Sequence, residues 1–491
     1  MKKNEDSYGH VLKYMGVFGG VQGVNMLMSL VRNKIMAVLL GPAGMGLNSL
    51  LNTAVTFVSQ STSFGISASA VKQTSEYYGA SDTKQLENYV KVVRAWTLMT
   101  ALLGTLVCIL IGPLLNYFSF SWGNHQLHFI LLAPSVGMMA ITGGETAILK
   151  GVRQLRSIAS IQVFAGIASV ILSIPIYYFF GLSGIVPVIV LMSLVTMLLT
   201  LRQSSKLFPL DLSFRQIRWK EGRAMLKLGT AFVVAGIWGS GAELVIRSFL
   251  NFHGNLDVVG MYNAGYMLMI TITGVVLSAM DADYFPRLSA VNSDTAAVNE
   301  IVNQQIEVSL YSVLPLMVLI QIYVPIVVPL LYSSDFSPIV EMLQLASFSM
   351  IFKVMALPIS YQTLAKGDSL AYMTLEIVCD VMMIVIILVG FTIGNLNGTG
   401  IALSVMWLAE FSLLAVCTHW RYGFSLSGDV VRTFVAVLTI GVLSFCVTAI
   451  ESAVCYWLLG TVVFLSSVGF SLRFFIKKVG LSAIRQRLRK K

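Results

Sequence analysis

Charged side chains are scarce in this chain: only 11% of its 491 residues are Asp, Glu, Lys or Arg, whereas 56% are hydrophobic. A soluble domain carries roughly 25% charged residues, so a water-soluble enzyme would lack the surface that it needs. Intrinsic disorder is excluded because it requires low hydrophobicity and high charge density. The long apolar runs also differ from the short alternating strands of a membrane β-barrel. The composition therefore predicts an all-α polytopic membrane protein.

Motifs for chemistry are missing as well. The five cysteines lie in apolar stretches, form no CxxC pair and are odd in number, which is typical of small buried hydrophobes. The sequence shows no nucleophile–base pair, no metal-binding cluster, no phosphate-binding glycine loop and no nucleotide-binding domain. We therefore expect neither an enzyme nor a resident cofactor, and no transport that this chain powers by hydrolysing ATP.

Long apolar segments dominate what is present. A helix that crosses the ~30 Å hydrocarbon core of a bilayer needs ~20 mostly apolar residues. By this rule the sequence predicts fourteen transmembrane spans. The expected spans are 11–31, 44–67, 91–116, 127–149, 157–179, 182–201, 226–250, 257–280, 309–332, 339–364, 371–393, 398–418, 430–450 and 453–472.

The basic residues orient these spans. The chain has 33 Lys and Arg against 23 Asp and Glu. With the N-terminus in the cytoplasm, all but four of the basic residues fall on segments that face the cytoplasm, which is the side that holds Lys and Arg loops. We therefore expect both termini inside. The four exceptions are Arg32, Lys34, Arg247 and Lys353.

Two similar halves are indicated by a weak internal repeat. VRNKIMAVLLGPAGMGLNS begins at Val31, and IRSFLNFHGNLDVVGMYNA begins at Ile246. In both segments a basic residue precedes a glycine-containing turn, and such repeats are common in transporters. The expected organisation is an N-lobe at 1–201, a cytoplasmic linker at 202–225, a C-lobe at 226–418, and two extra spans with a basic cytoplasmic tail at 419–491.

Three motifs carry a resemblance to a known superfamily: LLGPAGMGL from Leu39, VVGMYNAGY from Val258 and FPRLSAV from Phe285. They resemble the multidrug/oligosaccharidyl-lipid/polysaccharide transporters. Within that superfamily the chain is most similar to Wzx-type O-antigen flippases, including the lipid III flippases of enterobacterial common antigen synthesis. The resemblance covers the first twelve spans. The two further spans are similar to those of peptidoglycan lipid II flippases.

The resemblance implies two six-helix lobes around a central cavity. It implies a flippase that moves undecaprenyl-diphosphate-linked oligosaccharide from the cytoplasmic to the periplasmic leaflet of the bacterial inner membrane by alternating access. The implied partners are this lipid-linked oligosaccharide, membrane lipid, a polysaccharide polymerase and chain-length regulator proteins, with no nucleic acid. Three alternatives stay open: a lipid II flippase, a cation-coupled multidrug antiporter, and a passive scaffold in polysaccharide assembly.

Basic residues inside the spans are candidates for substrate binding, because a charge within the bilayer costs at least ~2.5 kcal/mol on insertion scales. Arg32 and Arg247 occupy equivalent places in the two repeats, and Lys353 lies near the middle of its span. Guanidinium and ammonium groups suit the diphosphate of a polyprenyl-linked sugar. The alternatives are interfacial anchoring for Arg32 and Lys34, and a local ion pair with Glu243 for Arg247.

Acidic residues in the eleventh and twelfth expected spans are candidates for coupling to H⁺ or Na⁺. Glu376 and Asp380 lie four residues apart on one helix face, and Glu410 lies near the middle of the next span. A carboxylate in a site of low dielectric exchanges a proton near neutral pH. The alternative is a solvated Glu376 at the cytoplasmic end, or neutralisation by Lys353.

One absence bears on the substrate. No Asp or Glu occurs between Asp6 and Glu76, so the first two expected spans carry no acid. Drug-cation antiporters of this superfamily generally use an acid in the first lobe. A first lobe with Arg32, and with Glu145 as the one acid inside its spans, favours an anionic substrate.

Overall fold

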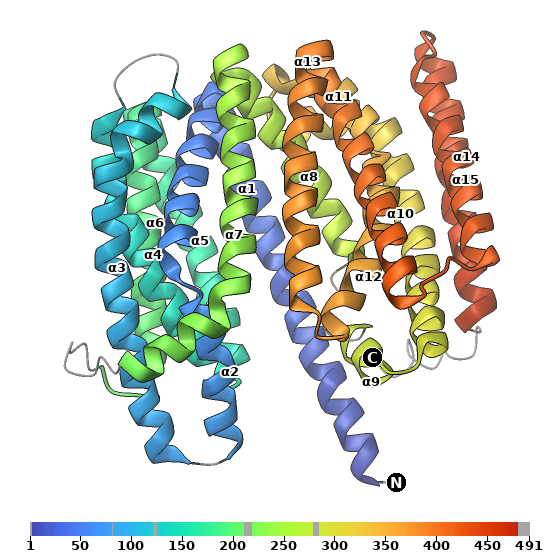
Figure 1. The fold of residues 1–491 in the computed structure, drawn as a ribbon. Coiled ribbons are helices and arrows are strands. Elements are labelled where there is room, and N and C mark those ends of the chain that lie inside the picture. Colours follow the sequence, from blue (N-terminus) through green and yellow to red (C-terminus); the bar gives the residue numbers. More distant parts are fainter. Residues whose placement is uncertain (1, 81, 121–124, 211–218, 278–283, 480–491) are drawn as a thin grey trace. The chain divides into compact units, whose positions relative to one another are not determined.

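The computed structural model describes residues 2–80, 82–120, 125–210, 219–277 and 284–479. Side chains are described for these residues except 2–25, 68, 219–232 and 478–479. Within these ranges every regular element is a helix, as Figure 1 shows. The chain forms two compact units, one of residues 1–260 with 331–333 and one of residues 261–330 with 334–491.

The first unit contains seven α-helices and the start of an eighth. They are α1 (Lys2–Ser63), α2 (Ile66–Gly79), α3 (Thr83–Ser119), α4 (Gln126–Gly151), α5 (Leu155–Phe180), the 3₁₀ turn η1 (Gly181–Gly184), α6 (Ile185–Ser205), α7 (Trp219–His253) and the beginning of α8 (Leu256–Leu277). The expected linker at 202–225 is helical up to Ser205, and its residues 211–218 lie outside the described residues.

The second unit contains the rest of α8 and the helices that follow it. They are α9 (Phe285–Ala290), α10 (Thr295–Leu331), the 3₁₀ turn η4 (Ser334–Phe336), α11 (Ile339–Ala346), α12 (Ser349–Ala365), α13 (Ser369–Tyr422), α14 (Gly428–Thr448) and α15 (Ala453–Val479). The basic tail expected at 485–491 lies outside the described residues.

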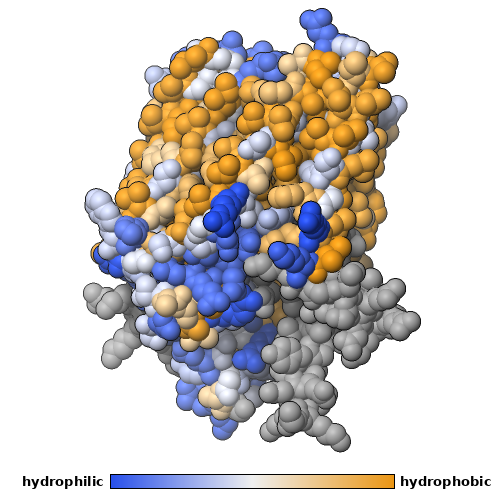
Figure 2. Space-filling view, turned by 90° about the vertical axis from the view of Figure 1, so that its right-hand side faces the viewer, coloured by the Kyte–Doolittle hydropathy of each residue, from blue (hydrophilic) through white to orange (hydrophobic). Residues whose placement is uncertain are grey.

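Within the described residues, ten helices are long and apolar enough to cross a membrane, or eleven if α11 and α12, which are bent by 44° at a short break, form one span. The chain is therefore an all-α polytopic membrane protein, and the expectation of fourteen spans and of their orientation stays a prediction. Figure 2 shows apolar side chains over much of the upper part of one face and hydrophilic side chains gathered below them.

Three of the helical stretches that are longer than one crossing requires also contain a break. They comprise 38, 51 and 54 residues, at Met26–Ser63, Leu155–Ser205 and Ser369–Tyr422. At a rise of about 1.5 Å per residue, each exceeds a ~30 Å hydrocarbon core. Each is also interrupted where a turn between spans was expected: at Gly41 with φ of 65°, at η1, and at Asn395 with φ of 49°. Glycine adopts such positive φ values without a Cβ clash.

The first helix extends further than the sequence predicted. The expected first span ended at residue 31, whereas α1 remains helical up to the break at Gly41. Arg32 and Lys34 consequently lie within the helix and not at its outer end. The segment after residue 67, which was expected to be a cytoplasmic loop, is largely helical too. Helix α2 begins after Gly65, which has a left-handed conformation. The Asp82 side chain then caps α3 by accepting from Gln85 N at 3.0 Å.

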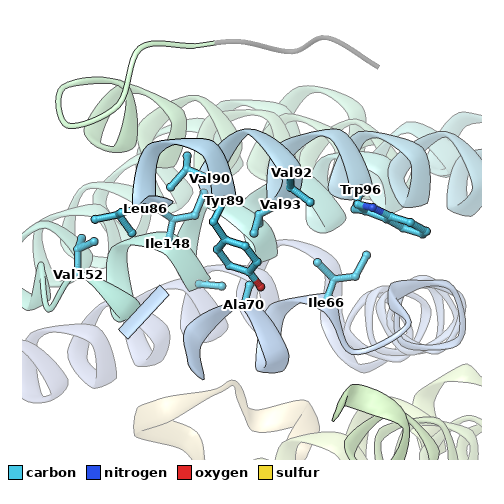
Figure 3. Packing of buried hydrophobic residues seen from close by; sticks show 11 residues of the cluster. Ile66, Ala70, Leu86, Tyr89, Val90, Val92, Val93, Trp96, Ile148 and Val152 are labelled. Atoms are coloured by element: carbon cyan, nitrogen blue, oxygen red, sulfur yellow. The ribbon is translucent and has the colours of Figure 1, made fainter. Parts of the chain in front are cut away.

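A hydrophobic cluster fixes α2 against α3 and α4, as Figure 3 shows in close-up. The cluster joins residues that repeat at helical spacing on each of the three helices, so each helix buries one face against the others. Its members are Ile66, Ala70, Leu86, Tyr89, Val90, Val92, Val93, Trp96, Ala147, Ile148 and Val152. The packing holds this end of α3 rigidly beside α4.

The two repeat segments meet in the first unit through their glycines. A Cβ on Gly46 would collide with the carbonyl oxygen of Leu256, and a Cβ on Gly260 would collide with that of Pro42. The same Cβ positions lie 3.0 Å from Gly260 N and 2.9 Å from Gly46 N, respectively. Since Pro42 and Gly46 correspond to Leu256 and Gly260 in the repeat, the contacts are reciprocal. A two-fold relation between the segments produces this reciprocity, which supports the internal repeat.

The last two helices pack on α10 within the second unit. The ring of Tyr311 stacks on Phe474 with centroids 3.8 Å apart, and the Tyr456 hydroxyl donates to the carbonyl of Ile322 at 2.6 Å. Tyr323 contacts α15 as well, through a hydrogen bond with Thr461 Oγ1 at 3.1 Å. Aromatic side chains on α10 and α15 therefore anchor the α14–α15 pair to the rest of this unit.

Candidate functional site

Arg247 is the best-defined basic residue of the first unit. It lies in α7, and its side chain is only 2% exposed. Its Nε donates to Ser49 Oγ at 2.8 Å, and its Nη1 donates to Glu243 Oε2 at 2.9 Å and to the Glu243 carbonyl at 3.3 Å. The local Glu243–Arg247 pair considered from the spacing is therefore present. The hydrogen bond to Ser49, 198 residues away, joins α7 to α1.

The two ends of this ion pair differ in exposure. The Glu243 side chain is 36% exposed, whereas the guanidinium is buried. Burial of a charge is tolerated when hydrogen bonds and an opposite charge accompany it. Ser49 and the backbone of Glu243 supply fixed acceptors, and the Glu243 carboxylate supplies the charge from the accessible side.

Lys34 and Arg32 lie on α1 of the same unit. The Lys34 ammonium donates to the backbone carbonyl of Tyr332, which belongs to the 331–333 segment of this unit. Arg32 is exposed and interacts electrostatically with the buried Tyr177 of α5. An exposed guanidinium on an apolar helix retains its donors for an anion, so Arg32 stays a candidate for substrate binding.

The second unit gathers Lys353 and three carboxylates. The Lys353 ammonium lies over the indole ring of Trp407, 4.7 Å from its centroid, which is a cation–π contact. Lys353 also interacts electrostatically with Glu410. Trp407 and Glu410 are three residues apart on α13, so they share one face of that helix towards α12. Neutralisation of an acid by Lys353, one of the sequence-based alternatives, is consistent with this arrangement.

Glu376 and Asp380 belong to the same group. Both interact electrostatically with Glu410, and Tyr372 lies within hydrogen-bonding reach of Glu376. The break in α13 at Gly394 and Asn395 folds the two parts of this helix back on each other, which brings residues 376 and 380 near residue 410. The three carboxylates therefore share one region of the second unit.

The candidate residues therefore form two sets, one in each unit. Arg32, Lys34 and Arg247 belong to the first unit, and Lys353 with the carboxylates belongs to the second. Among the residues that the structure describes, no three His, Cys, Asp or Glu side chains are placed to hold a metal ion. The first set is basic, and the second is mixed and mainly acidic.

A second buried Arg–Glu pair was missed from the sequence. Arg94 Nε donates to Glu145 Oε1 at 2.8 Å and its Nη2 to Glu145 Oε2 at 3.2 Å, with both side chains almost fully buried. Ser204 of α6 donates to the same carboxylate, and the carbonyls of Phe208 and Pro209 accept from Arg94. Arg94 was counted with a cytoplasmic loop. The one signal for a partner was Glu145, an acid inside an apolar span.

Solved structures share the fold of this chain. The lipid II flippase MurJ, in an inward closed conformation, has a TM-score of 0.75 at 12% identity, covering 94% of this chain and 99% of that chain. A multidrug resistance MATE family transporter of the MOP superfamily, in an inward-facing conformation, has a TM-score of 0.71 at 15% identity, covering 81% and 94%. The fold is that of a MOP superfamily transporter.

A third structure extends the comparison. A MOP superfamily transporter from Pyrococcus furiosus, described as having a binding pocket of reverse polarity, has a TM-score of 0.59 at 15% identity and covers 82% of this chain and 93% of that chain. At these identities the similarity concerns the fold alone. No curated protein matches this chain in sequence.

The family follows from the sequence itself. The model of the polysaccharide biosynthesis protein family matches residues 35–341, which is more than half of the chain. The chain belongs to the polysaccharide biosynthesis protein family. It is a multi-pass membrane protein of that family, with a fold that it shares with transporters.

Proposed function

We propose that the protein is a flippase for undecaprenyl-diphosphate-linked oligosaccharide. The observation that carries this proposal is Arg247, a buried guanidinium inside a span of a polysaccharide biosynthesis transporter, held by Ser49 and paired with an accessible carboxylate. Arginine binds phosphate oxygens in a bidentate manner and remains charged in sites of low dielectric. Arg32, Lys34 and Lys353 are the further basic residues that contact the diphosphate or sugars.

The charge distribution of α1 supports an anionic substrate. From Met26 to Ser63 this helix carries Arg32 and Lys34 and no Asp or Glu. The two carboxylates of this unit that form ion pairs inside its helices each have a basic partner, because Glu145 pairs with Arg94 and Glu243 with Arg247. A cationic drug would find little compensation for its charge here. These facts weigh against a multidrug antiporter.

The proposed topology has fourteen spans with both termini in the cytoplasm of a bacterium and the protein in its inner membrane. The count results if each of the three interrupted long helices crosses twice and the bent pair crosses once. Two lobes, at 1–201 and 226–418, rock against each other to give alternating access, as is general for transporters built from repeats. The lipid tail remains in the bilayer while the diphosphate and sugars cross.

Coupling to an ion gradient is assigned to the charged group of the second unit. Glu376, Asp380 and Glu410 take up H⁺ or Na⁺, and Lys353 tunes the charge of the group. The test is translocation by proteoliposomes under an imposed pH gradient or an imposed Na⁺ gradient. Activity that ignores both gradients would contradict the assignment. Glu410→Gln is expected to abolish the response to the effective gradient.

A lipid II flippase for peptidoglycan is the second candidate. It is favoured by the similarity in fold to MurJ, which extends over 94% of this chain. A scaffold role is a third reading, and it predicts that the charges within the helices tolerate replacement.

The decisive experiment deletes the gene and analyses lipid-linked saccharides and surface polysaccharide in the same cells. Loss of surface glycan, with undecaprenyl-linked repeat units accumulating in the inner leaflet, is the result that we expect. Complementation by the wild type, and failure of Arg247→Gln to complement, would tie the loss to the site. Blocked peptidoglycan synthesis would instead support the lipid II candidate, and drug sensitivity with normal glycan would support an antiporter.

A further inference from the structure

Glu243, which the sequence indicated as an ion-pair partner of Arg247, is a further functional candidate. Its carboxylate is the acidic partner of Arg247 at 2.9 Å, yet more than a third of its side chain is exposed. An apolar helix segment that serves only as a span has no need of an exposed carboxylate, and each such charge is costly. Its position beside a buried guanidinium suggests a role in controlling that charge.

The two partners are held with unequal strength. Arg247 is fixed on its buried side by Ser49 and by the backbone carbonyl of Glu243. Glu243 contributes one oxygen, Oε2, to the pair, and 36% of its side chain is exposed, so fewer contacts hold it than hold Arg247. If the pair opens, the carboxylate therefore leaves and the guanidinium stays in place.

An incoming anion meets this same guanidinium. A buried cation that loses its counter-charge is unfavourable, so binding of a second anion is favoured when Glu243 moves away. A phosphate oxygen takes up the hydrogen bond from Nη1 in the same geometry as Oε2, because both are charged acceptors at about 2.7–2.9 Å.

We propose that Glu243 is a displaceable counter-ion for Arg247: it occupies the guanidinium in the empty transporter, yields it to a phosphate group of the substrate, and returns to expel that group on release. The inference rests on the proposed function, since it assumes that Arg247 binds the diphosphate. Glu243 acts as a competing anion and makes binding weak enough for release. It is therefore a positioning residue for the substrate charge.

The test measures binding of undecaprenyl diphosphate to the purified full-length protein in nanodiscs of phosphatidylcholine, with uncharged undecaprenol as the matched ligand. Glu243→Gln is expected to bind the diphosphate about tenfold more tightly, the equivalent of about 1.4 kcal/mol. It should bind undecaprenol unchanged. In a flipping assay the same variant should be slower, because release is hindered.

Three controls separate the explanations. Glu300→Gln removes an exposed carboxylate of α10 that contacts Gln304, and it should leave diphosphate binding unchanged although the net charge changes equally. Arg247→Gln should lose the preference for the diphosphate over undecaprenol. Glu243→Asp keeps the charge on a shorter side chain and should bind no more tightly than the wild type, which distinguishes removal of charge from a change of packing.

The outcomes are distinct for the inference and for the function on which it rests. If the wild type shows no preference for undecaprenyl diphosphate that depends on Arg247, the proposed function itself fails at this site. If that preference is present but Glu243→Gln binds the diphosphate equally or more weakly, the counter-ion inference is wrong and the proposed function stands.

Discussion

Two Arg–Glu pairs in the first unit use the same chemistry in opposite ways. Arg94 and Glu145 lie 51 residues apart, on α3 and α4, and their side chains are 1% and 3% exposed. Arg247 and Glu243 lie one turn apart on α7, and their side chains are 2% and 36% exposed. The first carboxylate is enclosed by donors, whereas the second reaches out of its helix.

The difference separates a structural ion pair from an exchangeable one. Both oxygens of Glu145 accept from Arg94, and Ser204 donates a further hydrogen bond, so three hydrogen bonds hold the carboxylate in place. The carbonyls of Phe208 and Pro209 complete the shell around Arg94 and attach the residues after α6 to this pair. A pair of this kind fixes the fold, whereas the Glu243 pair is suited to open and close.

Glu145→Gln should have the largest effect on stability. The amide places an N–H group where Arg94 or Ser204 already directs a donor, and it leaves a buried guanidinium without a counter-charge. We expect the free energy of unfolding to fall by about 3–5 kcal/mol. The measurement is denaturation of the purified protein in detergent, followed by the loss of helical circular dichroism.

The double variant Arg94→Met with Glu145→Leu is the control. Because it removes both charges, it should recover much of the stability that Glu145→Gln loses. A fall of less than about 1 kcal/mol for Glu145→Gln would mean that water reaches this pair, and the contrast with Glu243 would be lost.

Gly46→Ala tests the part of α1 that positions Ser49, the hydrogen-bond acceptor of Arg247. Gly46 lies one turn before Ser49, and an added Cβ would collide with the carbonyl oxygen of Leu256. Overpacking of this kind costs about 1–3 kcal/mol, and the shift of α1 should also weaken the Ser49–Arg247 hydrogen bond. Thermal unfolding measures the first effect and diphosphate binding the second.

Gly274→Ala is the matched control for that substitution. It lies inside α8 with no atom within 4 Å of the added Cβ, so alanine should be tolerated or stabilise the helix by up to about 1 kcal/mol. Equal unfolding temperatures for the two variants would show that the contact between the repeat segments at Gly46 and Gly260 is not close-packed in the membrane.

Glu243→Gln should be much milder than Glu145→Gln, although the chemical change is identical. Only one oxygen of Glu243 accepts from Arg247, so the amide oxygen replaces it and the amide NH₂ group turns to the exposed side. We expect the free energy of unfolding to fall by about 1–2 kcal/mol, because Arg247 loses its counter-charge but Nη1 keeps an oxygen acceptor and Ser49 still accepts from Nε. The same denaturation assay measures it, and a loss as large as that of Glu145→Gln would show that both pairs are structural.

The sequence predicted what depends on local spacing. The pair at positions 243 and 247, the grouping of Glu376 with Asp380, and the turns near Gly41 and Asn395 all follow from helix geometry or from glycine and asparagine. Contacts between distant segments were not predictable from spacing. These include Arg94–Glu145, Ser49–Arg247 and the bond from Lys34 to the Tyr332 carbonyl, which are set by tertiary packing. The extension of α1 to Gly41 was not predicted, because a charged residue such as Arg32 after an apolar run is typical of the end of a span.

A third ion pair, between Arg421 and Asp368 on the surface of the second unit, is more exposed than the other two and should contribute least to stability. Asp368 caps α13, accepting from Ala371 N, from Arg421 and from the Tyr422 hydroxyl, and the Arg421 and Asp368 side chains are 59% and 21% exposed. The hydrogen bond from Arg421, followed by those from Ala371 N and Tyr422, lowers the pKa of Asp368. Water screens the pair, so its contribution to stability is small.

Asp368→Asn should therefore have the smallest effect, and one that depends on pH. A lowered pKa in the folded state means that the carboxylate stabilises the fold above its unfolded pKa of about 3.9 and that this stabilisation is lost as the pH falls through the lower folded value. The variant should melt slightly below the wild type at pH 7, and the difference should vanish in strong acid. Asp82→Asn is the control, because Asp82 caps α3 by accepting from Gln85 N and asparagine caps equally well. A difference for Asp368→Asn that persists unchanged in acid would assign the effect to the cap and not to the ion pair.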